Sequence, residues 1–234
     1  MKPRTTEQTA TIFNEWADRY DTDLEIGTMQ MGPLAGYAGS LSFAGGAVAR
    51  QLGAHSRLLD MGVGTGAFAD QVIAQHQDGS TLAVTGCDPS EGMRRRLKQS
   101  HSAFTVEPGD FLAIPSKEDG WDAIISSFAF HEVNPAQRPL AVSELIRVLC
   151  PGGMLALLDI MFASSAALIE AQAISDGWDP SETYHVIGDL DSQLREAGLT
   201  ELHWWQTAPM HWLMIGHRAI SEIAPQDAPG PPQD

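Results

Sequence analysis

A glycine-rich stretch, DMGVGTG at residues 60–66, is the part of the sequence with the clearest chemical meaning. It follows the short run RLL at 57–59, which has the character of a buried strand. Gly62, Gly64 and Gly66 stand at alternate positions, where they let the backbone turn sharply and approach a ligand closely. Because a glycine-rich turn directly after a strand is typical of nucleotide sites, the stretch predicts a nucleotide-like ligand.

Three kinds of ligand compete for such a turn: a phosphate group, a dinucleotide and S-adenosylmethionine. The stretch lacks the Gly-Lys-Ser/Thr ending of a phosphate-binding loop. Its third glycine comes one residue earlier than in the G-x-G-x-x-G pattern of dinucleotide sites. The carboxylate of Asp60, before the first glycine, repels a pyrophosphate and attracts an ammonium group. The spacing of the glycines and the charge of Asp60 both argue against a dinucleotide ligand.

Further acidic residues follow the next two predicted strands. Asp88 ends the run LAVTGCD, and its carboxylate is suited to accept hydrogen bonds from both hydroxyls of a ribose. Asp110 and Phe111 follow in VEPGDF, where the carboxylate suits an adenine amino group and the ring suits an adenine face. Each aspartate alone also fits a helix cap or a turn. Their order after successive strands indicates one binding site.

The stretch SSFAFHEVN at 126–134 supplies the best candidate for a catalytic base. Histidine is suited to removing a proton near neutral pH, and His131 is expected just past a strand, at the ligand edge of the sheet. Its neighbours are Glu132 and Asn134, and Asn134 and Tyr20 are included among the catalytic candidates. A structural histidine, or one that forms part of the cofactor wall, is the alternative.

Aromatic residues suit a sulfonium ligand because their faces attract a cation and exclude water. Trp16, Tyr20 and Phe128 are the candidates, although Trp16 fits the core of an amphipathic helix equally well. Tyr184 and His185, in the long connection before the sixth predicted strand, are further candidates for a substrate pocket.

The sequence predicts no metal site, because no histidines and cysteines have the spacing of metal ligands. Arg138, Arg147 and Arg195 lie on predicted helices and are expected at the surface. A pocket with so few cations disfavours a large anionic substrate and allows a small neutral or zwitterionic one.

Strand and helix patterns alternate along the chain, which predicts βαβ units and a mainly parallel sheet. The last two strands are separated only by residues 207–210, too short for a crossover helix, so they are expected to pair antiparallel. Strands are predicted at 57–61, 82–87, 103–106, 121–126, 154–160, 201–206 and 211–217, and helices at 66–76, 90–99, 135–149, 163–176 and 187–197.

Taken together, DMGVGTG, GCDPS, GDF and LCPGGMLALLD resemble the class I S-adenosylmethionine-dependent methyltransferases, in their small-molecule (type 11/12-like) branch. The amino-terminal FNEWADRYD resembles the lid helix of many such enzymes, and the resemblance spans roughly residues 12 to 217. It implies a doubly wound, Rossmann-like seven-stranded sheet with a reversed last strand, helices on both faces, and a turn at LCPGG before strand five.

The resemblance also assigns residues to S-adenosylmethionine. It implies that Asp60 and the three glycines surround the methionine part, that Asp88 binds the ribose, and that Asp110 and Phe111 bind the adenine. The remaining residues expected at the cofactor are Tyr20 from the lid and Pro89, Met93, Ser126 and Ser127.

The composition narrows the possible partners. A net charge of −16 argues against nucleic acid and against anionic membranes, since both attract clustered Lys and Arg. Two cysteines are too few for a disulfide framework, and the amino terminus lacks the apolar segment of a signal peptide, so a reducing, cytoplasmic location is expected. The sequence is silent on oligomeric state.

One domain is predicted for residues 1–224, with a disordered Pro-rich tail at 225–234. Residues 26–49 carry no charge, but their glycines argue against a membrane span. We expect them to form a short helix or a flexible segment that, with the lid helix, closes the site over residues 6–50.

Three functions remain open from the sequence. The first is methyl transfer from S-adenosylmethionine to a small molecule. The second is cyclisation, in which the methionine amine attacks its own γ-carbon, expels methylthioadenosine and closes azetidine-2-carboxylate, a four-membered-ring amino acid. The third is a sensor that binds S-adenosylmethionine without turnover.

Overall fold

The computed structural model describes residues 3–27, 32–77, 82–175 and 177–220. In chain order its elements are α1 (Thr6–Trp16), α2 (Tyr20–Gly27), α3 (Tyr37–Ala49), β1 (Arg57–Met61), α4 (Ala67–Gln75), β2 (Ala83–Asp88), α5 (Glu91–Ser100), β3 (Thr105–Pro108), β4 (Trp121–Ser127), the short 3₁₀ helices η1 (Phe130–Glu132) and η2 (Pro135–Gln137), α6 (Arg138–Val148), β5 (Leu149–Phe162), α7 (Ser165–Ile174), β6 (His185–Val186), α8 (Ile187–Glu196), β7 (Leu199–Gln206) and β8 (His211–Arg218).

The strands form one mixed sheet in the order β3-β2-β1-β4-β5-β8-β7. The pairs from β3 to β5 are parallel, and β8 is antiparallel to both of its neighbours, which confirms the predicted doubly wound fold with a reversed last strand. The two-residue β6 pairs with β5 and makes the sheet eight-stranded, one strand more than predicted. A strand this short carries no periodicity that a sequence pattern reveals.

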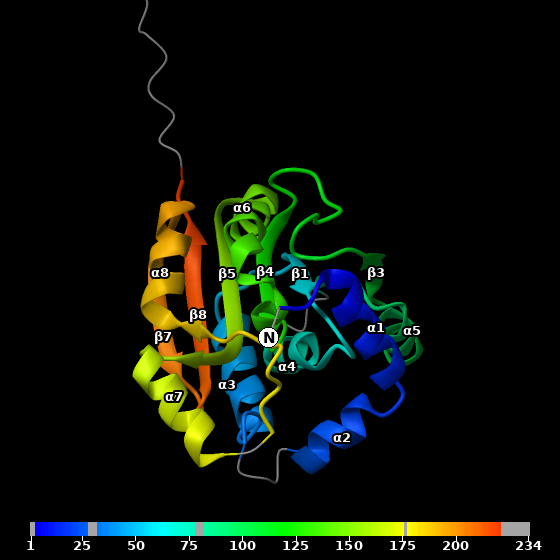
Figure 1. Ribbon diagram of the computed structural model, residues 1–234. Helices are drawn as coiled ribbons and strands as arrows, with labels where there is room; N and C mark the ends of the chain where they lie inside the picture. Colours follow the sequence, from blue (N-terminus) through cyan, green and yellow to red (C-terminus); the bar gives the residue numbers. More distant parts are fainter. Residues whose placement is uncertain (1–2, 28–31, 78–81, 176, 221–234) are drawn as a thin grey trace, which may run out of the picture.

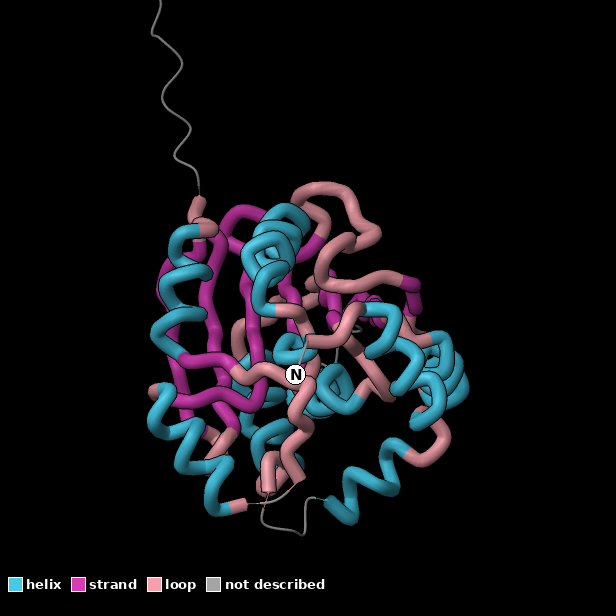
Figure 2. The backbone as a smooth tube through the Cα atoms, in the orientation of Figure 1, coloured by secondary structure: helices cyan, strands magenta, loops and turns pink. Residues whose placement is uncertain are grey.

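Helices cover both faces of the sheet, as Figures 1 and 2 show. Consecutive strand residues point to opposite faces, so Leu58 packs in the core under α3 and α4 whereas Leu59 packs in the core under α6 and α8. Because the central strands are buried on both faces, their sequences are nearly continuous apolar runs. The helix α1 lies against α5, near the β3 edge of the sheet (Figure 1).

The fifth strand differs from its prediction. It begins at Leu149 rather than at 154, so it includes the LCPGG segment that was predicted to be a turn before the strand. The pairing register with β4 shifts between Trp121 and Ala123, and Gly152 has a φ of +76°. An irregular strand start of this kind accommodates residues that favour turns without ending the strand.

The uncharged segment 26–49 gives a helix, as expected, but α3 does not cover the predicted site. It packs against α4 and the sheet, with Ala44 and Val48 fully buried. Helix α3 approaches α4 closely at Gly45, where a Cβ atom would lie 2.5 Å from the Cβ of Gln71. Ala44 and Gly45 therefore serve helix packing, and residues 28–31 lie outside the described part of the chain.

We predict that Gly45→Ala lowers the free energy of unfolding by about 1–3 kcal/mol, the usual cost of overpacking. Gly39→Ala is the matched control, because Gly39 lies in the same helix and a Cβ there meets no atom within 4 Å. That control is expected to be neutral or slightly stabilising. Urea denaturation of both variants checks the prediction, and equal stabilities would contradict the close helix contact.

Arg138 contradicts the expectation that it lies at the surface. Its side chain is buried, with only 8% of the residue exposed, and the guanidinium donates to the carbonyls of His131, Val133 and Thr183. Arg138 begins α6 directly after η1 and η2, so its side chain reaches back beneath those turns. Arg147 and Arg195 are partly exposed and pair with acidic residues of their own helices.

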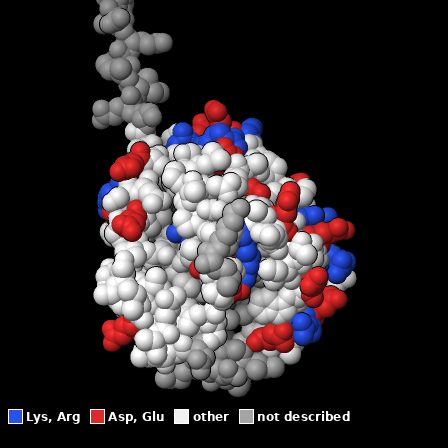
Figure 3. All heavy atoms as spheres, in the orientation of Figure 1, with Lys and Arg blue, Asp and Glu red and all other residues white. Residues whose placement is uncertain are grey.

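Figure 3 shows charged side chains in small groups of mixed sign on the face that it draws. That nucleic acid is not a partner stays a prediction from the net charge. Within the described ranges, no helix combines the length and apolar character needed to cross a membrane. The predicted disordered tail at 225–234 lies outside those ranges.

Candidate active site

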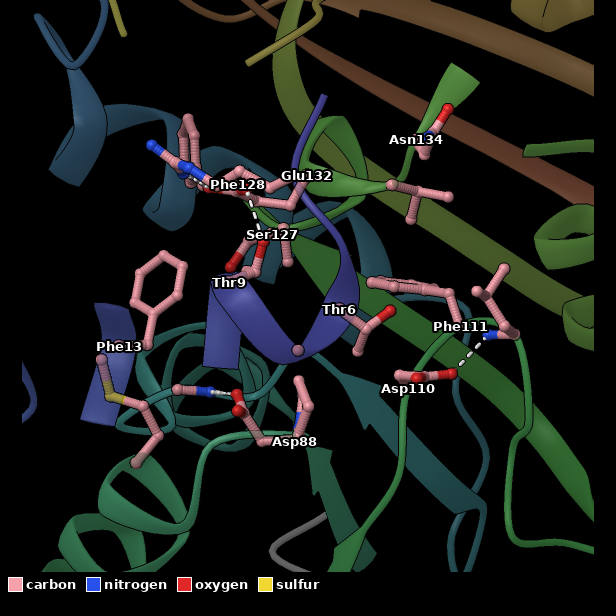
Figure 4. Close-up of a pocket in the computed structure, with 18 of the residues that line it drawn as sticks. Thr6, Thr9, Phe13, Asp88, Asp110, Phe111, Ser127, Phe128, Glu132 and Asn134 are labelled. Atoms are coloured by element: carbon pink, nitrogen blue, oxygen red, sulfur yellow. Dashed lines mark hydrogen bonds and ion pairs between the residues drawn. The ribbon is translucent and has the colours of Figure 1, made fainter. Parts of the chain in front are cut away.

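A cavity opens where the carboxyl ends of β1, β2 and β4 meet the amino-terminal helix α1 (Figure 4). It encloses about 810 Å³ of space, including the part open to solvent. Its wall comes from five segments: Arg4, Thr6, Thr9, Phe13 and Tyr20; Gly62 and Gly64; Asp88, Pro89 and Met93; Asp110, Phe111 and Leu112; and Ser127, Phe128, Ala129, Glu132, Val133, Asn134 and Gln137.

The glycine loop needs its glycines for two physical reasons. Gly62, Gly64 and Gly66 all have positive φ, of 66°, 53° and 97°, a region that other residues rarely adopt. A Cβ on Gly62 would also lie 2.5 Å from the Cβ of Ala129. Gly62 and Gly64 line the cavity, whereas Gly66 starts α4 behind it. The loop thus brings bare backbone to the cavity wall.

Asp88 lies at the end of β2 and is held rigidly. One carboxylate oxygen accepts from the backbone N–H of Gly64 at 3.0 Å, and the other accepts from Ser90 at 2.8 Å. Burial nevertheless raises the pKa of Asp88 to about 6. The residue is only 6% exposed yet lines the cavity, so its remaining lone pairs are available to a donor in the cavity.

Asp110 and Phe111 follow β3 and lie beside each other at the cavity wall, as Figure 4 shows. The Oδ1 atom of Asp110 accepts from the N–H groups of Leu112 and Ala113 at 2.7 and 3.1 Å, so the residue does form the turn that was its alternative explanation. Phe111 packs edge-on against Phe130 with ring centroids 5.2 Å apart. The turn fixes both side chains at the wall, where the adenine was predicted.

Asp60 and Ser126 lie behind the wall rather than on it. Both are 1% exposed, and Asp60 Oδ2 and Ser126 Oγ have no hydrogen-bond partner within the described structure. Burial raises the pKa of Asp60, while a hydrogen bond from the Ala69 backbone acts in the opposite direction. Unpartnered buried polar atoms are rare in proteins, and they fit a site that receives further donors from a ligand or water.

The helices α1 and α2, which the sequence predicts to belong to a lid, are fastened to the cavity rim. Asn14 Oδ1 accepts from the Ser90 hydroxyl and from the Gly92 N–H, both at 2.8 Å. The Thr65 hydroxyl, within the glycine loop, donates to Asp21 of α2 at 2.7 Å. These contacts connect the lid directly to the loops that carry Gly64 and Asp88.

The aromatic residues of α1 and α2 form two groups: some line the cavity, and one packs against its neighbours instead. Phe13 and Tyr20 line the cavity, and Phe128 faces them from the β4 side. Trp16 is not among the lining residues: its indole N–H donates to Asp23 at 2.7 Å, and its ring packs edge-on against Tyr20 with centroids 4.9 Å apart. The packing alternative therefore describes Trp16 better than a ligand contact does.

His131 lies next to the cavity but not on its wall. Its Nδ1 is 2.6 Å from Asp159 Oδ1 on β5, and its backbone N–H donates to the other oxygen of Asp159 at 3.0 Å. Burial lowers the pKa of His131, but the charges of Asp159, Glu182 and Glu132 outweigh it and raise the pKa to about 9. A histidine that keeps its proton at neutral pH accepts none, which weighs against the predicted role as a base.

Of the residues predicted to bind substrate, Phe128 lines the cavity, whereas Tyr184 and His185 do not. Tyr184 is buried and donates its hydroxyl to Glu182. His185 stacks on Phe130 with centroids 5.1 Å apart, and burial lowers its pKa to about 3. Asn134 does line the cavity, but its side chain caps η2 by accepting from the Ala136 N–H at 3.1 Å.

Four amino-terminal wall residues, Arg4, Thr6, Thr9 and Phe13, were not predicted from the sequence. Arg4 lines the cavity and pairs with Glu132 at 3.2 Å and with Asp179, and Thr9 donates to Glu132 at 3.3 Å. Only Thr5 left a signal: the T-x-x-Q capping box that starts α1, in which Thr5 and Gln8 cap each other. The ion pairs of Arg4 join residues that no local pattern connects.

Comparison with known proteins gives consistent matches. Residues 58–153 match the family model of the methyltransferase domain. An uncharacterised methyltransferase of Geobacillus kaustophilus is 31% identical over 162 residues, which cover 68% of this chain and 70% of that protein.

Solved structures with a similar fold include two proteins of different activity. One is an S-adenosylmethionine-dependent methyltransferase of Thermotoga maritima, a possible histamine N-methyltransferase (TM-score 0.63, 18% identity, 89% of this chain and 99% of that one). The other is the [4+2]-cyclase SpnF (TM-score 0.62, 17% identity, 77% of this chain and 81% of that one). At such identities the likeness concerns the fold alone.

Proposed function

Because this chain belongs to the class I S-adenosylmethionine-dependent methyltransferases, we propose that it transfers a methyl group from S-adenosylmethionine to a small-molecule acceptor. The observation that carries the proposal is the meeting of Gly62, Gly64, Asp88 and Asp110 in one cavity beneath the lid. Family and fold imply the cofactor, and the acceptor class is inferred from the cavity.

The residues of the cavity suit this cofactor. Asp88 would hold the ribose hydroxyls, and Asp110 with Phe111 would hold the adenine. The glycine loop leaves room at the wall for the methionine part, and the unpartnered Oδ2 of Asp60 lies directly before that loop. A cation nearby would also restore the charged form of Asp60, whose pKa burial raises.

When bound, S-adenosylmethionine supplies a methyl group that its sulfonium makes electrophilic. The chain's own part is to hold an acceptor in line with that group and to exclude water, because positioning is a large source of rate acceleration. Phe13, Tyr20 and Phe128 provide apolar, cation-attracting faces for this purpose. The lid contacts of Asn14 and Asp21 keep those faces over the cavity.

The charges on the wall support a small neutral or zwitterionic acceptor. Arg4 is a cation that the sequence did not place there, but Glu132 and Asp179 already engage it. A bulky anion would have to displace both carboxylates. The other polar residues that the first helix and the segment 132–137 bring to the wall, Thr6, Thr9, Asn134 and Gln137, are uncharged.

Product identification tests the proposed reaction. Purified protein is incubated with S-adenosylmethionine, with and without a panel of small acceptors, and the nucleoside product is identified by mass. We expect S-adenosylhomocysteine, formed only when an acceptor is present. Heat-denatured protein is the control for spontaneous breakdown of the cofactor.

The same measurement separates the alternatives. Formation of methylthioadenosine without any acceptor would show that the reaction is cyclisation and not methyl transfer, because the nucleophile is then the cofactor's own amine. Tight binding of S-adenosylmethionine with neither product, across the panel, would favour a sensor. The fold alone does not decide between them, as the cyclase SpnF illustrates.

A further inference from the structure

Three side chains beside the cavity have the composition of a metal-binding cluster. One ligating atom each from His131, Glu132 and Glu182 lies within 4.8 Å of the other two. Metal bonds of about 2.1 Å place ligand atoms roughly 3–4 Å apart, so small side-chain rotations bring these atoms to bonding distance. His131 and Glu132 come from η1, whereas Glu182 comes from the segment before β6.

The imidazole of His131 is already oriented as a metal ligand. Asp159 holds Nδ1 at 2.6 Å, so when a metal ion displaces the proton of Nε2, the remaining proton stays on Nδ1 and the lone pair of Nε2 points away from Asp159. Nε2 has no hydrogen-bond partner among the described residues, and Glu182 lies 3.8 Å from it. The side chain is 7% exposed. A carboxylate behind a histidine in this way is the usual outer-shell arrangement of metal sites.

We propose that His131, Glu132 and Glu182 bind one divalent transition-metal ion at the edge of the cavity. A histidine nitrogen with two carboxylates suits Mn²⁺, Fe²⁺, Co²⁺ or Zn²⁺ better than Ca²⁺ or Mg²⁺, which prefer oxygen ligands alone. Because Glu132 lines the cavity, an ion held there faces any molecule in that part of it. The site does not depend on the reaction proposed above.

The guanidinium of Arg4 takes the place of the ion in the metal-free chain. Its Nη1 lies 3.2 Å from both oxygens of Glu132 and 3.9 Å from Glu182, between two of the proposed ligands. Arg4 lies outside the helices, immediately before the cap of α1, so it can withdraw without unfolding an element. Metal and Arg4 therefore compete for the same carboxylates.

Direct titration of the chelator-treated protein with Mn²⁺ tests the site, by calorimetry and by loss of the electron paramagnetic resonance signal of free Mn²⁺. We expect one Mn²⁺ per chain in the wild type. Glu182→Gln keeps the shape of the side chain and should weaken binding by about tenfold or more. Arg4→Ala should strengthen binding by about tenfold, because it removes the competing cation.

Glu201→Gln is the matched control, since Glu201 lies 3.9 Å from His217 and this pair belongs to no three-residue metal-binding group among the described residues. It should leave Mn²⁺ affinity unchanged. Circular dichroism verifies folding, and Mn²⁺ should raise the melting temperature of the wild type more than that of Glu182→Gln. Binding detectable only in Arg4→Ala also supports the site. The proposal is overturned if folded Arg4→Ala binds no Mn²⁺, or if Glu182→Gln binds Mn²⁺ as tightly as the wild type. The four side chains would then form an ion-pair network only.

Discussion

Asp88→Ala is expected to weaken the binding of S-adenosylmethionine by about ten- to hundredfold, which corresponds to roughly 1.5–3 kcal/mol for a charged hydrogen-bonding group. The carboxylate would accept from the ribose, and it also holds the Gly64 N–H at 3.0 Å, so its loss affects the ligand and the loop together. Isothermal titration calorimetry on the folded variant measures the change.

Two further variants separate these contributions. Asp88→Asn keeps the shape of the side chain while removing its charge, and should lose less affinity than Asp88→Ala. Glu107→Gln, at an exposed carboxylate of the neighbouring strand β3, is the control and should bind normally. Unchanged affinity in folded Asp88→Ala would show that the ribose is held elsewhere.

The pKa of Asp88, raised by burial to about 6, adds a pH dependence. A ribose diol donates to the charged carboxylate, so binding favours the deprotonated form. Wild-type affinity should be constant above about pH 7 and fall up to about tenfold per unit below about pH 6. Asp88→Asn should lose this dependence, because an amide does not titrate.

Arg138→Met is expected to lower the free energy of unfolding by about 3 kcal/mol or more. The guanidinium donates to Val133 O at 3.1 Å and to the Thr183 hydroxyl at 2.9 Å, among other contacts, and methionine leaves those acceptors unpaired. Each unpaired buried group costs about 1–3 kcal/mol. Chemical denaturation monitored by circular dichroism measures the difference.

Arg195→Met is the control for Arg138→Met. Arg195 lies on an exposed helix surface, with a side chain 51% exposed and an ion pair to Asp191, and its loss should cost less than about 1 kcal/mol. Arg138→Lys keeps the charge but not the planar fork of donors, so it should recover only part of the stability. Equal destabilisation by the two methionine variants would mean that the buried bonds of Arg138 contribute little.

The sequence by itself determined seven of the eight strands of the sheet and their order along the chain, although not the start of β5. The predicted first strand, 57–61, matches β1 residue for residue, and the short segment 207–210 correctly required an antiparallel final pair. These predictions depend on local properties: apolar runs, glycine turns and the minimum length of a crossover. The same logic placed Gly62, Asp88 and Asp110 together, because the ends of parallel strands meet at one edge of the sheet.

Only the tertiary structure decided what surrounds those residues. Trp16 and Asp60 sit next to residues of the cavity wall, yet packing turns Trp16 toward Asp23 and keeps Asp60 behind the wall. A helical arginine is usually exposed, but Arg138 is buried because η1 and the segment before β6 fold over it. A local sequence pattern predicts which face of a helix or strand a side chain is on. It does not predict which other segment of the chain packs against that face.

The cluster of His131, Glu132 and Glu182 with Arg4 is the clearest example of an arrangement that only the tertiary structure decided. The expectation of no metal site came from spacing along the chain, and Glu182 and Arg4 are both far from His131 in sequence. They meet because β5 places Asp159 behind the histidine while the amino terminus and the segment before β6 converge on η1. Such contacts arise from chain segments that approach only after the sheet has formed, so no pattern within any one segment encodes them.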